Sequence, residues 1–417
     1  MEAIIISIGD ELLIGQVINS NPAFIAERLQ PLGVSVRRIL TIGDDEFEIL
    51  KALEHGFTHY DLTIVTGGLG PTCDDVTRAA VCEFFQTDLV SDEAALERIK
   101  LYVQQRNLPW TKEAEDQALV PRVAKIIPNQ HGTAPGLVFE RGGRTFIVMP
   151  GVPYEMEAMV EEHVVPLLRA RQIKKVIRHC TLNTTGISEA SLATKVGNPK
   201  ASVQGAKLAF LPGPTGVRLR ITVEDTDANR ADQHVAEIEK RIHAAAATYI
   251  YGIDNDTMEK VIGKLLAEGK LTISVAESCT GGMVANRITN VPGSSNYFER
   301  GVVTYSNRSK IEILGVSSEL IERHGAVSRE VAEAMASGIR RIAQTDIGLS
   351  TTGVAGPTGG SDVKPVGLVW IGYSDARDNF AVKYQFANDR LRFKERASQA
   401  AMELVRRRLL NIPIREK

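Results

Sequence analysis

The sequence predicts an α/β protein in which two blocks with mostly parallel sheets flank a smaller α+β unit. Short β-branched runs alternate with helical patterns over residues 1–168, and the same alternation returns after residue 255. This alternation with short loops is typical of a parallel sheet covered by helices on both faces. Between the blocks, residues 172–252 have a different texture, with in-and-out strand alternation and one long helix. A chain of 417 residues also implies more than one domain.

The composition is that of an ordinary soluble globular protein, with 43% hydrophobic and 24% charged residues. The formal net charge of −2 gives no basic excess, so nucleic acid is not expected as a main partner. The start, MEAIIISIGDELLIG, has no basic leader and a short apolar run, so we expect neither a signal peptide nor a membrane span. The four cysteines are scattered and form no CxxC pair, which predicts free thiols in a reduced, cytoplasmic protein.

In the first block, strands are expected at residues 3–8, 34–41 and 61–66. Asn21 and Pro22 predict the cap and first residue of a helix that ends before Gly33. Asp45 predicts the cap of a second helix, and a third is expected after residue 75.

Polar groups follow each of these strands, where ligands of parallel sheets bind. They are Asp10 and Glu11, then Asp44, and then a loop with Gly67, Gly68, Gly70 and Asp75. Glycines allow backbone amides to approach phosphate oxygens, and the carboxylates require a bridging divalent cation beside phosphate. The combination favours a metal-assisted phosphate or pyrophosphate site. The alternative is that Asp74 and Asp75 only cap a helix and the glycines only make a turn.

Several motifs in this block occur in one order, namely GDELLIGQVINSN, TGGLGPTCDDVT, GTAPG and PGVPYEM. Together they resemble the N-terminal domain of the competence/damage-inducible protein A (CinA) family, which is similar to the three-layer molybdopterin-binding fold. The resemblance implies an ADP-ribose pyrophosphatase over residues 1–168 that depends on a divalent metal cation. It further implies that Asp75 and Asp44 serve the metal and nucleotide site.

The middle unit resembles the KH-like domain of the same family. Residues 206–211 and 217–223 predict a hairpin whose turn contains Gly213 and Gly216. This spacing imitates the nucleic-acid-clamping GxxG of KH domains, but that loop belongs between helices and here joins strands. We therefore favour a spacer or dimer-contact role over RNA binding.

The C-terminal block, residues 255–417, follows an expected linker at residues 251–256 and opens with a helix for which Thr257 is the predicted cap. The block centres on residues 272–282. Apolar residues run into Glu277, Ser278 and Thr280 and then into two glycines and a helical pattern. This predicts a strand, a tight turn and a helix, with side chains exposed at the corner and free helix amides nearby. The alternative is an ordinary capped helix start.

A serine hydroxyl needs a base to become a nucleophile, and no histidine motif or G-x-S-x-G is present. Lys310, beyond a strand expected to end near Tyr305, can serve as the base if burial lowers its pKa. Cys279 is a competing nucleophile. Arg390 can bind a phosphate as a fork, and the glycine-rich loop at Thr352 and Gly353 can wrap one. Lys310 and Arg390 can equally be solvated surface residues.

The motifs AESCTGG, GSS, TYSN, HGAVS, TGVAGPTGG and KPVG resemble the C-terminal CinA domain, a nicotinamide mononucleotide (NMN) amidohydrolase. The resemblance implies hydrolysis of NMN to nicotinate mononucleotide and ammonia without a cofactor. It assigns Ser278 as the nucleophile, Lys310 as its base and Arg390 to the substrate phosphate, with Tyr305 and Thr352 lining the site. We place the oxyanion hole at the amides near Thr280 and Gly281, with Glu277 beside the substrate.

The sequence thus predicts a bifunctional enzyme of pyridine-nucleotide recycling whose partners are small nucleotides, and we also expect a homodimer. One rival is a competence or DNA-damage accessory protein that binds without chemistry. Another is an N-terminal domain that binds a nucleotide or a pterin without hydrolysis.

Overall fold

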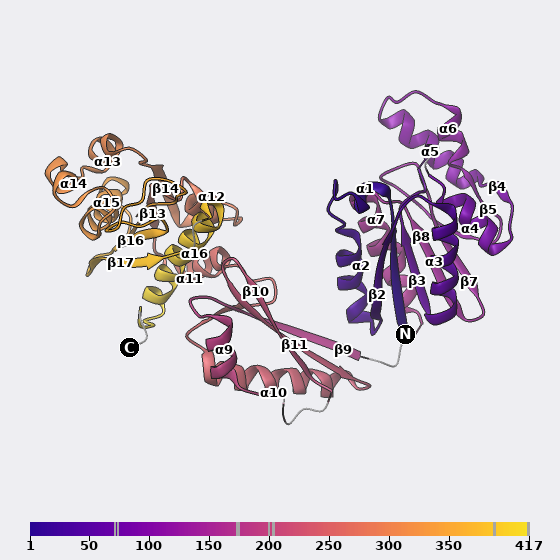
Figure 1. The fold of residues 1–417 in the computed structure, drawn as a ribbon, viewed down its shortest axis with the longest axis horizontal. Helices are drawn as coiled ribbons and strands as arrows, with labels where there is room; N and C mark the ends of the chain where they lie inside the picture. The colour runs from indigo at the N-terminus through magenta and orange to yellow at the C-terminus, as the bar shows by residue number, and fades with distance from the viewer. Residues whose placement is uncertain are drawn as a thin grey trace. The chain divides into compact units, whose positions relative to one another are not determined.

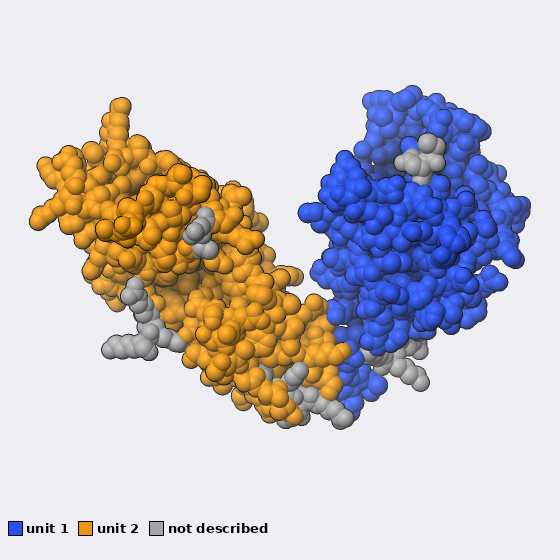
Figure 2. All heavy atoms as spheres, in the orientation of Figure 1, with its two compact units in different colours: residues 1–178, 223–233 blue, residues 179–222, 234–417 orange. Residues whose placement is uncertain are grey.

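The computed structural model describes residues 1–70, 72, 75–171, 176–198, 201, 205–386 and 389–414 (Figure 1). The chain divides into two compact units, residues 1–178 with 223–233 and residues 179–222 with 234–417 (Figure 2). The three-domain boundaries expected from the sequence therefore stay a prediction. Within the described residues, no helix has both the length and the apolarity that crossing a membrane requires.

The first unit contains a six-stranded sheet in the order β2-β1-β3-β8-β7-β6. β1 pairs in parallel with β2 and β3, and β3 with β8, whereas β7 runs antiparallel to β8 and β6. The parallel strands end at one edge, which brings their following loops together. The strands are β1 (Glu2–Ile8), β2 (Ser35–Ile42), β3 (Leu62–Thr66), β6 (Lys125–Ile127), β7 (Gly136–Arg141) and β8 (Arg144–Met149).

Helices cover both faces of this sheet, as expected for an α/β layer. On one face, the apolar sides of α2, α7 and α8 pack in one buried cluster with Ile5 and Ile64. On the other face, α3 and α4 pack in a second cluster with Ile4 and Val65. The two clusters use alternate residues of the same strands because successive strand side chains point to opposite faces. The helices are α1 (Asp10–Leu13), α2 (Asn21–Leu29), α3 (Glu46–His59), α4 (Thr77–Phe85), α7 (Pro153–Met159) and α8 (Val165–Arg169), with the 3₁₀ turn Gln30–Leu32 and the π-helical turn Val160–Val164.

The segment of the first unit between α4 and β6 forms a two-stranded antiparallel sheet with two helices. Its buried residues form a separate small cluster around Ile99. Its elements are β4 (Leu89–Ser91), α5 (Glu93–Gln105), α6 (Lys112–Asp116) and β5 (Leu119–Pro121).

The middle segment forms a four-stranded sheet in the order β10-β11-β9-β12. β10 and β11 make the expected hairpin, in which Gly213 pairs with Gly216. The GxxG-spaced loop therefore joins two strands, as the sequence predicts. The elements are β9 (Val176–Thr184), α9 (Glu189–Val196), β10 (Lys207–Gly213), β11 (Gly216–Asp225), α10 (Ala228–Ala246) and β12 (Ile250–Ile253).

The C-terminal segment is a five-stranded sheet in the order β14-β13-β15-β16-β17. β13 pairs in parallel with β14 and β15, and β16 and β17 continue antiparallel. β13 is an interior strand and fully buried, and its carboxyl end is flanked by those of its two parallel neighbours. The strands are β13 (Ile273–Glu277), β14 (Phe298–Val303), β15 (Ile347–Gly353), β16 (Leu368–Ser374) and β17 (Asn379–Gln385).

Two helical layers enclose this second sheet. α11, α12 and α16 contribute to the large core with Ile273 and Val275. α13, α14 and α15 contribute to a smaller cluster with Ala276, on the opposite side of β13. The helices are α11 (Met258–Gly269), α12 (Met283–Thr289), α13 (Asn307–Leu314), α14 (Ser318–His324), α15 (Arg329–Ala343) and α16 (Arg390–Leu409), with the 3₁₀ turn Ser294–Asn296.

Two local expectations were wrong. Ser20, not Asn21, is the N-cap residue of α2, and the buried Asn21 side chain donates instead to the Gly151 carbonyl at 2.7 Å. The residues after 250 were expected to form a linker, yet Ile250–Ile253 is strand β12, which pairs with β9. The caps Asp45 and Thr257 and the stop at Gly33 are confirmed.

Candidate functional site

The first candidate site lies at the corner between β13 and α12. The Ser278 N–H continues the strand pairing by donating to the Thr351 carbonyl at 2.9 Å. Gly281 and Gly282 then adopt φ values of +61° and +92°, which glycine reaches without steric cost. The chain reverses sharply after the strand and leaves the Ser278 side chain at the corner, 8% exposed.

Lys310 meets Ser278 there from the opposite side. Lys310 Nζ lies 3.1 Å from Ser278 Oγ, within hydrogen-bonding distance. Its other partners are the carbonyls of Thr304 at 2.8 Å and Tyr305 at 3.3 Å. The structure thus brings together the two residues expected to act as nucleophile and base, and Lys310 is not a solvated surface lysine.

The surroundings of Lys310 favour its neutral form. The side chain is 1% exposed and makes no ion pair among the residues that the structure describes. Burial lowers the pKa of the Lys310 amine from its ordinary value, because desolvation disfavours the charged form. A neutral amine has two N–H donors and one lone pair. The two carbonyls can take the donors, so the lone pair remains for the Ser278 hydroxyl.

Glu277, expected beside the substrate, has another role. Its buried carboxylate accepts hydrogen bonds from Gly282 N at 2.9 Å, Val284 N at 3.1 Å and Ala285 N at 2.8 Å. It therefore satisfies the first amides of α12 and compensates the positive end of that helix. Through these bonds Glu277 fixes the turn that presents Ser278.

Thr280 and Gly281 differ in whether their backbone N–H groups are available to an oxyanion. The Gly281 N–H donates to the Ser278 carbonyl at 3.1 Å, so it is already used inside the turn. The Thr280 hydroxyl is buried and pairs with the Thr351 hydroxyl at 2.7 Å. The Thr280 N–H has no hydrogen-bond partner within the described part of the chain. Of the two amides proposed for an oxyanion hole, Thr280 is the one that remains.

Cys279 is not placed to compete with Ser278 as a nucleophile. Its side chain is 4% exposed, and burial raises the pKa of the thiol to about 12. A thiol is nucleophilic as its thiolate, which this environment suppresses. Cys82, Cys180 and Cys279 are free thiols, and Cys73 lies outside the described residues.

Tyr305 and Arg390 form the exposed side of this site. Arg390 Nη2 donates to the Tyr305 hydroxyl at 2.9 Å, and Nη1 donates to the Gly356 carbonyl at 2.8 Å. Both side chains are exposed, but these bonds fix the guanidinium above the glycine-rich loop. The Tyr305 carbonyl also accepts from Lys310. Tyr305 therefore connects the exposed guanidinium of Arg390 to the buried amine of Lys310.

Thr352 and Gly353 lie at the end of β15 and make internal contacts. The Thr352 hydroxyl donates to the Ala326 carbonyl at 2.7 Å, which ties the loop before α15 to the sheet. A Cβ on Gly353 would lie 2.5 Å from the Leu368 carbonyl oxygen, so glycine allows β16 to approach. Their contact with a substrate stays a prediction.

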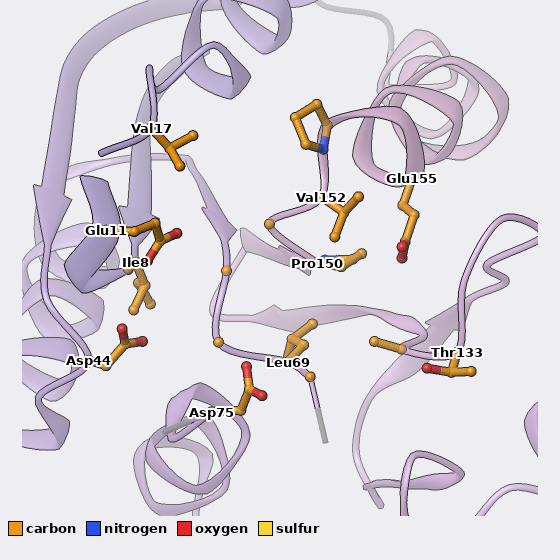
Figure 3. Close-up of a pocket in the computed structure, with 17 residues that line it drawn as sticks. Ile8, Glu11, Val17, Asp44, Leu69, Asp75, Thr133, Pro150, Val152 and Glu155 are labelled. Atoms are coloured by element: carbon orange, nitrogen blue, oxygen red, sulfur yellow. The ribbon is translucent and has the colours of Figure 1, made fainter. Parts of the chain in front are cut away.

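A second candidate site lies beyond the carboxyl ends of β1, β3 and β8. A pocket of about 460 Å³ is lined there by Glu11, Asp44, Gly67, Gly68, Gly70 and Asp75, as well as by the loop after β8. Figure 3 shows Glu11 and Asp44 on one side of the view, Thr133 and Glu155 on the other, and Asp75 between them. The three polar segments singled out in the sequence therefore converge.

Asp10 does not line this pocket but supports it. The Asp10 N–H donates to the Asp44 carboxylate at 3.0 Å, and the Asp44 N–H donates to the Asp10 carboxylate at 3.2 Å. This reciprocal pair ties the start of α1 to the loop after β2. Asp10 thus orients Asp44, and Glu11 is the member of this segment that faces the cavity.

The glycine loop also holds Asp75 in place. Asp75 does not cap α4, because its carboxylate accepts from the Thr72 N–H at 2.9 Å and from the Thr72 hydroxyl. Asp74, the other residue of that alternative, lies outside the described residues. Gly67 has a φ of +108° and its Cβ position is 2.1 Å from the Ile8 carbonyl oxygen, so no side chain fits there.

The residues at this pocket fit a hard divalent cation only together with a ligand. Among the described residues, no three His, Cys, Asp or Glu side chains are grouped closely enough to hold a metal themselves. Mg²⁺ usually takes one or two carboxylates and fills its other positions with water and phosphate oxygens. Asp44 and Asp75, which line one cavity, match that requirement.

Comparison with known proteins agrees with this architecture. The descriptions "Probable molybdopterin binding domain", "Damage-inducible protein CinA KH domain" and "CinA C-terminal domain" match residues 4–170, 179–252 and 255–409. A putative competence-damage inducible protein from Caldicellulosiruptor saccharolyticus is 42% identical over 99% of this chain and 100% of its own length. The chain belongs to the CinA family.

Two further comparisons differ in how much of the chain they cover. The CinA-like protein of Chloroherpeton thalassium is 44% identical over 99% of this chain and 100% of its own. The crystal structure of a CinA protein of unknown function from Thermoplasma acidophilum matches with a TM-score of 0.36 and 38% identity, over 38% of this chain and 94% of that chain. These names state no reaction. Membership of the CinA family confirms the resemblance and the fold class.

Sequence reasoning missed Glu155 as a pocket residue of this CinA chain. Glu155 lies in the first turn of α7, is buried, and accepts from Asn129 Nδ2 at 2.7 Å. The same Asn129 amide donates to the Ala134 carbonyl at 2.9 Å, which joins two loops of the pocket. The signal was present in the PGVPYEM motif after β8, since a carboxylate follows a stiff turn at a strand end.

Proposed function

We propose that the C-terminal domain hydrolyses the carboxamide of NMN to nicotinate mononucleotide and ammonia. The observation that supports this most is the 3.1 Å contact between Ser278 Oγ and the buried amine of Lys310. A hydroxyl at a strand-to-helix corner, a base with lowered pKa and a nearby unpaired amide are the parts that acyl transfer needs.

In the proposed reaction, Ser278 Oγ attacks the carbonyl carbon of the amide while the neutral Lys310 takes the hydroxyl proton. The carbonyl oxygen becomes an oxyanion near the Thr280 N–H. Lys310 then gives its proton to the amide nitrogen, and the C–N bond breaks to release ammonia. Water, deprotonated by Lys310, attacks the resulting ester, the bond to Ser278 Oγ breaks, and Lys310 returns the proton to Oγ, so that nicotinate mononucleotide is released.

The direct test is incubation of the purified protein with NMN. We expect nicotinate mononucleotide and ammonia in equal amounts, and the same rate after treatment with a metal chelator. Free nicotinamide, which has the amide but no ribose phosphate, is the control for substrate recognition. If NMN remains unchanged, the deamidase proposal is wrong.

For the N-terminal domain we propose cleavage of ADP-ribose to AMP and ribose 5-phosphate. The supporting observation is the convergence of two carboxylates and a glycine loop on one pocket of about 460 Å³. Asp44 and Asp75 would hold a divalent cation, which when bound neutralises the charge of the pyrophosphate. Water adds across the P–O–P bond, and the backbone amides of Gly68 and Gly70 are suited to hold phosphate oxygens. The Gly67 N–H already donates to the Met149 carbonyl at 3.0 Å.

This second activity is tested by measuring AMP from ADP-ribose with and without Mg²⁺ or another divalent cation. We expect AMP only with the metal. Binding of ADP-ribose without AMP formation would support the reading that this domain binds a nucleotide or pterin without hydrolysis. A competence or DNA-damage accessory role requires both assays to be negative. A cytoplasmic location and a homodimer remain predictions.

A further inference from the structure

A further cavity, of about 540 Å³, lies within the second compact unit. Four segments line it, namely the turn between β9 and α9, the hairpin turn between β10 and β11, the end of β17 and one face of α16. None of the described residues that line it is assigned to either proposed reaction. We call it the α16 cavity, and its lining includes Ile187, Tyr384, Phe386, Arg396, Ala400 and Glu403.

The hairpin turn that forms one wall of the α16 cavity is held from two sides. The Thr185 hydroxyl donates to the Thr215 carbonyl at 3.2 Å, which ties the turn to the end of β9. Arg396 Nε donates to the Pro214 carbonyl at 3.1 Å, which ties it to α16. The cavity is therefore formed between anchored segments, as is usual for small-molecule sites.

Arg396 brings an unpaired positive charge to the α16 cavity. Its Nε is bound to the Pro214 carbonyl. Within the part of the chain that the structure describes, neither Nη1 nor Nη2 has an acceptor, and Arg396 takes part in no ion pair. A guanidinium that is held through Nε keeps its two terminal nitrogens as a fork, which matches the oxygens of a phosphate or carboxylate.

The other charged groups at the cavity direct an anion toward Arg396. The Glu403 carboxylate accepts from Arg406 Nε and from Arg407 Nε, each at 2.6 Å, so the charge of Arg407 is already paired. Glu189 lies in the first turn of α9 and is exposed, so it repels an anion from that end of the cavity.

Tyr384 and Phe386 give the cavity an aromatic wall. They are two positions apart on one strand and so share a face, and their ring planes are nearly parallel, at 12°, with centroids 5.8 Å apart. Ile187 and Ala400 add aliphatic surface. A flat ring can pack against such a wall. The backbone N–H groups of Gly186 and Ile187 have no partner among the described residues and can donate to acceptor atoms at the edge of that ring.

We propose that the α16 cavity binds a mononucleotide, with the base against Tyr384 and Phe386 and the phosphate on Arg396. A bare anion would pair with the guanidinium but would leave most of the 540 Å³ unfilled. A neutral aromatic compound would fill the cavity but would leave the guanidinium without an anion. A mononucleotide supplies both the ring and the charge. The proposal does not depend on the deamidase or the pyrophosphatase activity.

The test is calorimetric titration of the whole chain with AMP, GMP, CMP and UMP. A chelator is present, so that metal-dependent binding at the pocket beyond β1, β3 and β8 does not contribute. We expect at least one nucleotide to bind, and its nucleoside to bind about tenfold or more weakly, the usual loss for a hydrogen bond to a charged group. Arg396→Met, which keeps the apolar stem, should weaken nucleotide binding by a similar factor. Arg392→Met is the matched control, because Arg392 is an exposed arginine one turn earlier on α16 and does not line the cavity.

A second variant keeps the proposal testable if Arg396→Met loses stability. Ala400→Leu adds bulk inside the cavity without removing a charge or a hydrogen bond, so we expect it to abolish nucleotide binding and to leave the thermal unfolding temperature close to the native value. Failure of all four nucleotides to bind the native protein would overturn the proposal. Binding that survives both variants would also overturn it, because the nucleotide would then lie elsewhere. Inorganic phosphate that competes at equal concentration would show a bare anion site instead.

Discussion

Ser278 Oγ and Lys310 Nζ lie 3.1 Å apart, although the two residues are 32 positions apart and belong to different elements. The contact exists because the loop after β14 and the first turns of α13 fold over the end of β13. Glu277, the carboxylate next to Ser278 in sequence, accepts from three backbone N–H groups of the α12 start and forms no ion pair with Lys310. Lys310 is thus buried with carbonyl and hydroxyl partners only, which favours a neutral, proton-accepting amine.

The pH dependence of ammonia release should report Lys310. We predict that kcat/KM for NMN rises with pH and levels off above the pKa of Lys310, because only the unprotonated amine accepts the Ser278 proton. Burial lowers that pKa, so the rise should occur below the range of an ordinary lysine. Lys310→Arg, which stays protonated, should lose about 100-fold or more of the activity. A flat profile together with an active Lys310→Arg would exclude Lys310 as the base.

Cys279 should be dispensable. We predict that Cys279→Ala keeps ammonia release within a few-fold of the native rate, because the buried thiol has a pKa raised to about 12 and yields little thiolate. The native protein should likewise resist inactivation by iodoacetamide at this residue, as checked by peptide mass spectrometry. Loss of activity in Cys279→Ala with unchanged thermal stability would instead point to a thiol nucleophile.

Glu277 should contribute to stability more than to substrate contact. Glu277→Gln replaces a charged acceptor of three N–H bonds, so we expect a loss of about 1–3 kcal/mol in the free energy of unfolding. Urea denaturation followed by circular dichroism measures this. The matched control is Glu299→Gln, an exposed carboxylate on β14. Unchanged stability with a raised KM for NMN would favour the original assignment of Glu277 to the substrate.

The two sites should be separable by mutation. We predict that Asp75→Asn lowers the rate of metal-dependent AMP formation from ADP-ribose by about 100-fold or more, because Asp75 is proposed to hold the cation. The same variant should release ammonia from NMN at the native rate. Asp10→Asn should have a smaller effect, because Asp10 lies behind Asp44. The control is Glu97→Gln on the exposed side of α5. AMP formation that survives Asp75→Asn would remove this residue from the metal site.

Local patterns predicted much of this structure because they depend on neighbours in sequence. The strand, turn and helix at Ser278 follow from apolar residues, two glycines and a helical period, and the structure has them. The caps at Asp45 and Thr257 follow from a carboxylate or hydroxyl before a helix. The convergence of the polar loops at the pocket beyond β1, β3 and β8 follows from the parallel sheet.

Contacts between distant segments were harder to predict. The roles of Glu277 and Asp10 depend on which backbone amides come within reach, and sequence spacing does not specify this. The Arg390 to Tyr305 bond joins residues 85 positions apart. The family resemblance assigns both residues to the site but does not predict this bond.

The most direct test of the central claim is ammonia release from NMN by the native protein, Ser278→Ala and Lys310→Met, measured side by side at saturating substrate. The account predicts release by the native protein and a loss of about 10³-fold or more in each variant, with little further loss in the double variant because the two residues act as one unit. Native-like release by Ser278→Ala would contradict the account.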